Sequence, residues 1–206
     1  EQELRQLFIE EFKKEHTDLY FSIETPTVYK YSFTNELMEI CVSEKGQSAL
    51  IDMCVLKKES ETSNYTRLLN IEFKHKNATE ANISKDILKL MHEEQNGAFV
   101  LLLKNTNTGT LTNSADHRFG VIDKVIDSIQ HHYKNKENWK GGNEKSVEVV
   151  ILSLEDGKKN GKPFIMQRTI FKTELETLDK TLNKWKKEEL EDREYNSVDL
   201  IEKLIF

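Results

Sequence analysis

An uninterrupted apolar run, AFVLLLK at residues 98–104, limits the fold of this chain more than any other feature. Strands with one exposed face alternate apolar and polar residues, so a continuous run predicts a strand that is buried on both faces. The segment before it, residues 79–95, has apolar residues at helical spacing, with Thr79 as N-cap. Asn96-Gly97 ends this predicted helix and leads into the strand.

The same two patterns recur along the rest of the chain. Residues rich in β-branched and aromatic side chains predict further strands over 19–33, 37–44, 48–57, 67–76, 146–155 and 164–172. Apolar residues at spacings of three and four predict further helices over 2–16, 116–134 and 174–190, with a last helix that Ser197 caps. The order α-β-β-β-β-α-β-α-β-β-α-α predicts an α/β fold with a mixed, partly antiparallel sheet.

The length of 206 residues suits one compact domain with additions. We predict a single domain over 1–206, with its core within residues 1–104 and an α-β-β-α extension with C-terminal helices within 105–206. The chain does not begin with Met and ends in the apolar run Leu204-Ile205-Phe206, so we expect it to be part of a larger protein.

Hydropathy and cysteine usage predict a cytoplasmic protein. No apolar stretch is long enough to span a membrane, and no signal peptide is visible at the start. Cys41 and Cys54 do not have CxxC spacing, so we expect two reduced thiols.

The charge distribution is uneven. A net charge of -6 argues against a general nucleic-acid coat protein, whose affinity for phosphates requires many clustered Lys and Arg residues. Residues 134–187, however, hold thirteen Lys and Arg against eight Asp and Glu, a net of +5. We therefore expect a local basic face on an acidic molecule.

The most informative chemistry lies in the hairpin predicted over residues 48–76. Alternate residues of a strand share a face, so Glu72 and Lys74 point to one side while Phe73 points to the other. If the hairpin is centred near Thr62, residue i faces residue 124 minus i, and Asp52 lies opposite Glu72. Opposed like charges destabilise a sheet, whereas a divalent cation such as Mg²⁺ or Mn²⁺ would neutralise them.

These residues resemble the PD-(D/E)xK nuclease superfamily: Asp52 on one strand, Glu72-Phe73-Lys74 on the next, then a helix and a buried strand. The resemblance implies a restriction-endonuclease-like α-β-β-β-α-β core. It also implies a metal-dependent endonuclease that acts on DNA, less often on RNA, and by analogy a role in restriction or phage defence. In the family's pattern, Asp52, Glu72 and the Phe73 carbonyl bind Mg²⁺ or Mn²⁺, and Lys74 orients the attacking water.

Many members of the superfamily also use a Glu of the first helix. Glu11 and Glu15 both fall on the face of the predicted helix 2–16 that carries its apolar residues, and we prefer Glu11 as a further metal ligand.

Several lysines are candidates for nucleic-acid contacts. Lys85 and Lys89 lie on the helix after the motif strand, which often lines the active site in this superfamily. Lys158, Lys159 and Lys162 belong to the predicted hairpin turn of the basic segment. The alternative for both groups is a solvated face without function.

Two other interpretations of the whole chain stay open. One is a non-catalytic nucleic-acid-binding or dimerisation module on a degenerate nuclease fold; the other is an unrelated α/β domain. A homo-oligomer is compatible with either.

Overall fold

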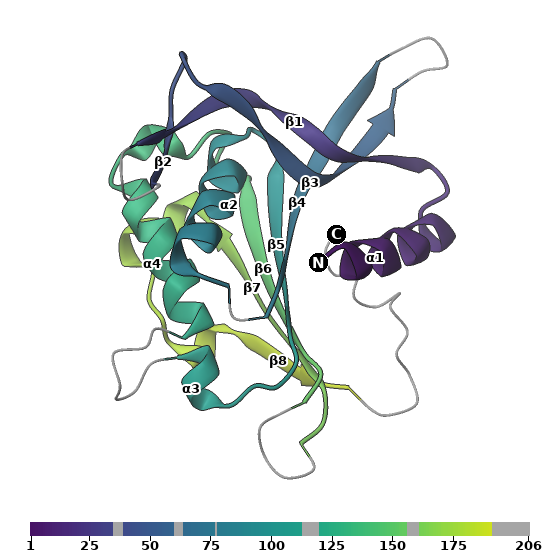
Figure 1. Cartoon of the computed structure of the whole chain (residues 1–206), viewed down its shortest axis with the longest axis vertical. Coiled ribbons are helices and arrows are strands. Elements are labelled where there is room, and N and C mark those ends of the chain that lie inside the picture. The colour runs from purple at the N-terminus through teal and green to yellow at the C-terminus, as the bar shows by residue number, and fades with distance from the viewer. Residues whose placement is uncertain (35–38, 60–63, 77, 113–119, 156–160, 191–206) are drawn as a thin grey trace.

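A computed structural model describes the chain except residues 35–38, 60–63, 77, 113–119, 156–160 and 191–206. The described residues form a mixed α/β protein with one open sheet of eight strands and helices on both faces (Figure 1). The strands are β1 (Leu19–Thr34), β2 (Glu39–Val42), β3 (Gln47–Lys58), β4 (Tyr65–His75), β5 (Asn96–Leu103), β6 (Ser146–Ser153), β7 (Phe164–Phe171) and β8 (Lys186–Glu189). The α-helices are α1 (Gln2–Glu15), α2 (Glu80–His92), α3 (Thr108–Leu111) and α4 (Val121–Tyr133).

The sheet is antiparallel at both ends and parallel in the middle. Its strand order is β2-β1-β3-β4-β5-β6-β7-β8. The parallel pairs are β4–β5 and β5–β6, and a parallel neighbour requires a long crossover connection. Here α2 provides the first crossover, and α3 and α4 lie in the second.

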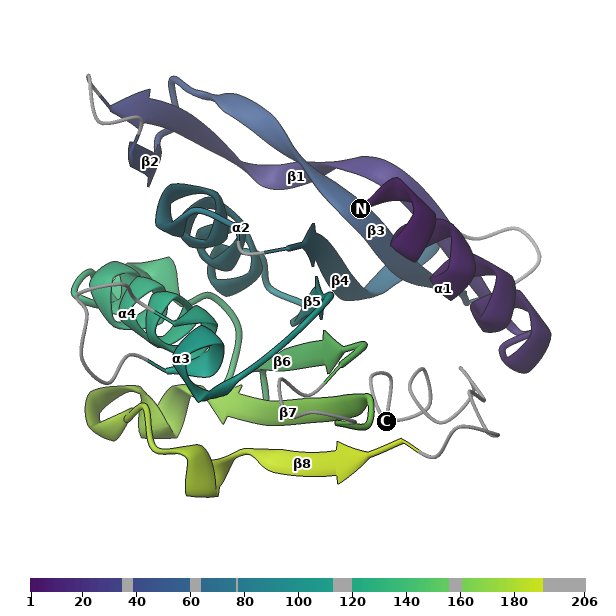
Figure 2. The same ribbon diagram turned by 60° about the horizontal axis from the view of Figure 1, so that its bottom comes forward.

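Helices pack against both faces of the central strands. In Figure 2 the sheet is seen nearly edge-on, with α2, α3 and α4 on one side and α1 on the other. Phe99 and Leu101 of β5 belong to the core under α2 and α4, while Ala98 and Val100 belong to the core under α1. The doubly buried strand predicted from the apolar run is therefore confirmed.

Most predicted elements are present with shifted ends, but the predicted helix over 174–190 is wrong. This segment instead forms two 3-10 turns, η2 (Lys172–Thr177) and η3 (Leu182–Lys184), followed by strand β8. The Asp179 side chain accepts a hydrogen bond from the Thr181 backbone N–H at 2.8 Å, a local bond that competes with helical pairing. The helix predicted from Ser197, and the start of the helix predicted over 116–134, lie outside the described residues.

The apolar residues of this segment are buried even though the helix is absent. Leu175, Leu178 and Trp185 pack into the same core as α4. In its described residues the extension has α3 and α4, then β6 and β7, then 3-10 turns and β8, so the predicted α-β-β-α order is wrong at its last helix.

The hairpin of β3 and β4 has the predicted register from Met53 to Val55, and its pairing shifts by one residue between Val55 and Leu56, toward the turn. Met53 pairs with Ile71 and Cys54 with Asn70, so that paired numbers add to 124. Along β4, Ile71 and Phe73 enter the core beneath α1. Because successive residues alternate, Glu72 and Lys74 lie on the opposite face, which α2 covers (Figure 1).

Candidate functional site

Asp52 is held at the point where β3 and β4 stop pairing. One carboxylate oxygen, Oδ2, accepts a hydrogen bond from the Phe73 backbone N–H at 2.8 Å. The side chain is half-buried and lies at the floor of an open cleft. This bond fixes the Asp52 carboxylate next to the strand that carries Glu72.

Glu72 is almost completely buried, with 1% of its surface exposed. Its Oε1 lies 2.5 Å from Nζ of Lys89 on α2. Burial raises the pKa of Glu72 well above its ordinary value, and the Asp86 and Asp52 charges raise it further against the opposing effect of Lys89. Glu72 is therefore a carboxylate crowded by two others, and an additional nearby cation would stabilise its ionised form.

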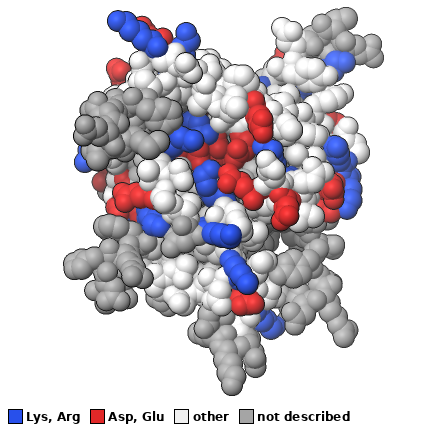
Figure 3. Space-filling model, viewed as in Figure 1, with Lys and Arg blue, Asp and Glu red and all other residues white. Residues whose placement is uncertain are grey.

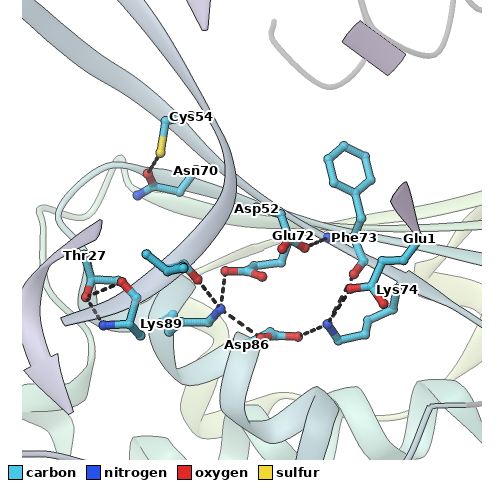
Figure 4. A network of polar contacts seen from close by, with 12 residues as sticks. Glu1, Thr27, Asp52, Cys54, Asn70, Glu72, Phe73, Lys74, Asp86 and Lys89 are labelled. Carbon is cyan, nitrogen blue, oxygen red and sulfur yellow. Dashed lines mark hydrogen bonds and ion pairs between the residues drawn. The ribbon is translucent and has the colours of Figure 1, made fainter. Parts of the chain in front are cut away.

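Asp86 of α2 joins the two lysines of the site. Its Oδ2 lies 2.6 Å from Nζ of Lys74, and its Oδ1 lies 2.9 Å from Nζ of Lys89 (Figure 4). Lys74 also reaches Glu1, whose Oε1 is 3.1 Å away. We call Asp52, Glu72, Lys74, Asp86 and Lys89 the carboxylate–lysine cluster.

Both lysines of the cluster carry a positive charge. Burial disfavours the charged form of Lys74, but the Asp86 and Glu1 carboxylates together outweigh that effect and raise the Lys74 pKa above its ordinary value. For Lys89, the Glu72 and Asp86 carboxylates similarly outweigh burial and raise the pKa. Neither lysine is thus suited to accept a proton near neutral pH.

The cluster lies at the floor of a cleft of about 820 Å³. Strands β1, β2 and β3 contribute to its lining on one side and α2 on the other, with Lys45 and Lys85 among the lining residues. On the face of the molecule that Figure 3 shows, acidic atoms near the centre are bordered by Lys and Arg atoms. The cleft therefore presents oxygen ligands at its floor and ammonium groups around them.

The structure brings together most of the residues predicted for the site. Asp52, Glu72, Phe73 and Lys74 are neighbours through the hairpin register and the Asp52–Phe73 hydrogen bond. Lys85 lines the cleft. Their assigned roles stay predictions, because position alone does not test binding or catalysis.

Lys89 lies at the buried floor of the cleft rather than on an exposed helix face. Only 3% of its surface is exposed, and its Nζ contacts Glu72, Asp86 and the Leu50 carbonyl. This position suits a structural cation better than a contact to a nucleic-acid phosphate.

Four predicted residues either do not line the cleft or lie outside the described part of the chain. Glu11 pairs with Lys14 of α1 at 2.6 Å and is not among the residues that line the cleft. Lys158 and Lys159 lie outside the described residues, and Lys162 is exposed after that gap. The α1 side of the site is occupied by Glu1 instead of Glu11.

Sequence reasoning underestimated Asp86 and missed Glu1. Asp86 and Lys89 stand among the apolar residues of α2 that face the core, and charged residues at such positions are buried only when they are paired. That pattern is a signal that could have placed both in the site. Glu1 carries no comparable signal, because only the packing of α1 brings it to Lys74.

The donor atoms of the cluster fit a magnesium-type cation. Among the described residues, no group of three or more His, Cys, Asp and Glu side chains is arranged to hold a metal ion. Mg²⁺, however, is commonly bound through one or two carboxylates and keeps several waters. Asp52, Glu72 and the Phe73 carbonyl offer two carboxylates and one carbonyl, a hard oxygen donor set that suits such an ion.

The chain was also compared with known proteins. No protein-family model, no curated protein and no solved structure matches it.

None of the helices in the described part of the chain is long and apolar enough to cross a membrane. Cys41 and Cys54 are both free thiols.

Proposed function

We propose that this protein is a Mg²⁺- or Mn²⁺-dependent endonuclease that hydrolyses phosphodiester bonds, with DNA as its substrate. One observation carries the proposal: Asp52 and Glu72 sit on neighbouring strands at the floor of an open cleft, with Lys74 two residues beyond Glu72. A purely structural sheet avoids adjacent carboxylates of this kind, because each raises the cost of ionising the other.

The order of elements supports the same proposal. Helix α1, strands β1, β3 and β4, helix α2 and strand β5 follow the α-β-β-β-α-β order expected of a restriction-endonuclease-like core. The short strand β2 is an addition at the sheet edge. The family assignment is thus part of the proposal, resting on this order and on the motif residues.

In this mechanism Asp52, Glu72 and the Phe73 carbonyl would hold the metal ion. When bound, the ion polarises the scissile phosphate and lowers the pKa of the attacking water. Lys74 remains charged, so it orients that water or neutralises phosphate charge and does not remove the proton itself. Asp86 keeps the Lys74 ammonium in place through their 2.6 Å ion pair.

The cleft walls supply contacts for the substrate backbone. Lys45 and Lys85 line the cleft and can attract phosphates without reading the sequence of bases. Lys158, Lys159 and Lys162 remain proposed contacts of the basic segment.

A non-catalytic nucleic-acid-binding or dimerisation module is the second candidate. It is favoured by the fact that Lys74 and Lys89 already neutralise Glu72 and Asp86 without any metal. Calorimetric titration with Mn²⁺ separates the two candidates, because only the nuclease should bind the ion in a way that depends on Asp52 and Glu72.

A cleavage assay on supercoiled and linear DNA, with RNA offered in parallel, tests the proposal. We expect cleavage with Mg²⁺ or Mn²⁺ and none in EDTA. Asp52→Asn and Glu72→Gln should abolish it, and Lys74→Met should slow it by about 100-fold or more. Glu94→Gln, which removes an exposed carboxylate outside the cleft, is the matched control and should cleave normally. Cleavage that persists in EDTA, or in the Asp52 and Glu72 variants, would refute the mechanism.

A further inference from the structure

Lys89 has a complete set of oxygen partners. Its Nζ lies 2.8 Å from the Leu50 carbonyl oxygen, 2.5 Å from Glu72 Oε1 and 2.9 Å from Asp86 Oδ1. An ammonium group has three N–H donors, so each donor has one oxygen. Figure 4 shows the Lys89 nitrogen between the Glu72 and Asp86 carboxylates.

The same three oxygens are ligands of the type that a divalent cation takes. Two carboxylates and one carbonyl form a hard oxygen set, which suits Mg²⁺ or Mn²⁺ as well as it suits an ammonium. The nitrogen belongs to the side chain of Lys89 on α2. This side chain is nearly excluded from solvent, so its charged end cannot move into water.

Lys74 occupies a different position. It contacts the other oxygen of Asp86 and also Glu1, and it is more exposed than Lys89. Lys74 therefore borders the open part of the cleft, while Lys89 fills the space between Glu72 and Asp86.

We propose that Lys89 is a built-in cation that takes the place of a second metal ion, so that the site binds one divalent ion, on its Asp52 side. Lys89 is in this sense a positioning residue. Its ion pair with Glu72 holds that carboxylate in place to bind the metal ion, and its ion pair with Asp86 keeps the Asp86 carboxylate from binding the ion. The inference rests on the proposed function, since it specifies how many metal ions that site uses.

The key variant is Lys89→Met, which keeps the length of the side chain and removes its charge. Isothermal titration with Mn²⁺ should find one ion per chain in the wild type and two in Lys89→Met, because Glu72 then loses its ammonium partner and Asp86 keeps only Lys74, on its other oxygen. Mn²⁺ should also raise the melting temperature of Lys89→Met more than that of the wild type, since binding to the folded state alone stabilises it.

Lys145→Met is the matched control. Lys145 is as buried as Lys89, and its Nζ donates to the backbone carbonyls of Met91 and Glu93, with no carboxylate among these partners. Its loss removes a buried lysine of the same kind from outside the cluster, so the Mn²⁺ count should stay at one. A second ion in both variants would overturn the assignment to Lys89.

Asp86→Asn tests the inference without removing Lys89, and it decides the question if Lys89→Met does not fold in EDTA. If Asp86 serves the lysines and not the metal, Asp86→Asn should weaken Mn²⁺ binding by less than about 100-fold, the range for a residue that only supports a ligand, whereas loss of a direct carboxylate ligand should weaken it by more than about 100-fold. A weakening of that size, or one ion with unchanged affinity in Lys89→Met, overturns the built-in cation. Absence of Mn²⁺ binding by the wild type would instead refute the proposed nuclease.

Discussion

His92 shows how one buried side chain links the stability of this protein to pH. It belongs to α2, is 4% exposed, and its ring packs edge-to-face against Tyr29 and Tyr31 at centroid distances of 4.6 and 6.2 Å. Burial lowers the pKa of His92 to about 4, and the Lys140 charge adds to the effect. The folded protein therefore holds this imidazole in its neutral form.

This depressed pKa predicts a loss of stability in acid. Between pH 6.5 and about 4 the unfolded chain binds a proton at His92 that the folded chain does not, so stability falls as the pH falls through this window. We expect His92→Phe, which retains an aromatic ring, to remove about 1–3 kcal/mol of the difference in unfolding free energy between pH 7 and pH 4. Urea unfolding at both pH values measures this.

Individual residues of the site were predictable to different degrees. Strand alternation and hairpin register sufficed for Asp52, Glu72 and Lys74, since both are local properties of β3 and β4. The partners Asp86 and Lys89 depend on how α2 lies over the sheet. A helical pattern shows which residues of α2 face inward, but not which strand residues they meet.

At the scale of elements, Glu93 connects the end of α2 to an irregularity in β1. The pairing of β1 with β3 shifts between Pro26 and Lys30. There the Glu93 carboxylate accepts hydrogen bonds from the backbone N–H groups of Val28 and Tyr29, at 3.1 and 3.2 Å, and pairs with Arg67 at 3.3 Å. Beyond this irregularity, β1 continues into the wall of the cleft.

Removal of the Glu93 carboxylate should therefore loosen the junction between the end of α2 and the irregular part of β1. It is fully buried, and Glu93→Ala would leave two backbone donors and a guanidinium without their acceptor, which we expect to cost about 2–4 kcal/mol of unfolding free energy. Glu94→Ala, one residue further at an exposed position, should cost under about 1 kcal/mol. Chemical denaturation of the two variants makes the comparison. Equal losses would show that the buried carboxylate does not hold the junction.

Whether a segment forms a helix or a strand was predictable where its tertiary contacts favour the same structure as its own pattern of apolar residues. The pattern of α2 was confirmed together with its cap, because the Thr79 side chain accepts a hydrogen bond from the Asn82 N–H. Residues 174–190 have a similar spacing of apolar residues but form 3-10 turns and β8. There the edge of β7 offers backbone partners, and pairing with it competes with the helix.

At the scale of the whole molecule, the acidic net charge and the proposed anionic substrate must be reconciled. The lysines around the cleft floor offer one route, because phosphate attraction depends on local rather than total charge. We expect DNA affinity to fall steeply with salt. Lys45→Glu and Lys85→Glu should each reduce the slope of log K against log salt by about one unit, and charge reversal at Lys158, Lys159 and Lys162 should act in the same way.

Fluorescence anisotropy of a labelled duplex in EDTA, where cleavage is off, measures these slopes. Lys57→Glu, on the part of β3 that does not line the cleft, is the control for a general change of charge. Slopes that stay at the wild-type value in all lysine variants would place substrate capture elsewhere.

The sheet as a whole was only partly predictable. The succession of strands and helices indicates a mixed α/β fold, but it does not give the order in which strands lie side by side. That order depends on two crossovers and on the edge positions of β2 and β8. These are long-range choices that no single segment encodes.

The location of the cluster along the chain has a consequence for how such a protein can diversify. Apart from Glu1, the groups that meet there come from residues 50 to 89, within three consecutive elements: β3, β4 and α2. Strands β6, β7 and β8 enlarge the far side of the sheet without contributing a side chain to the carboxylate–lysine cluster. Insertions or exchanges in that half can therefore alter the surface of the molecule while the carboxylate–lysine cluster stays intact within one short stretch of sequence.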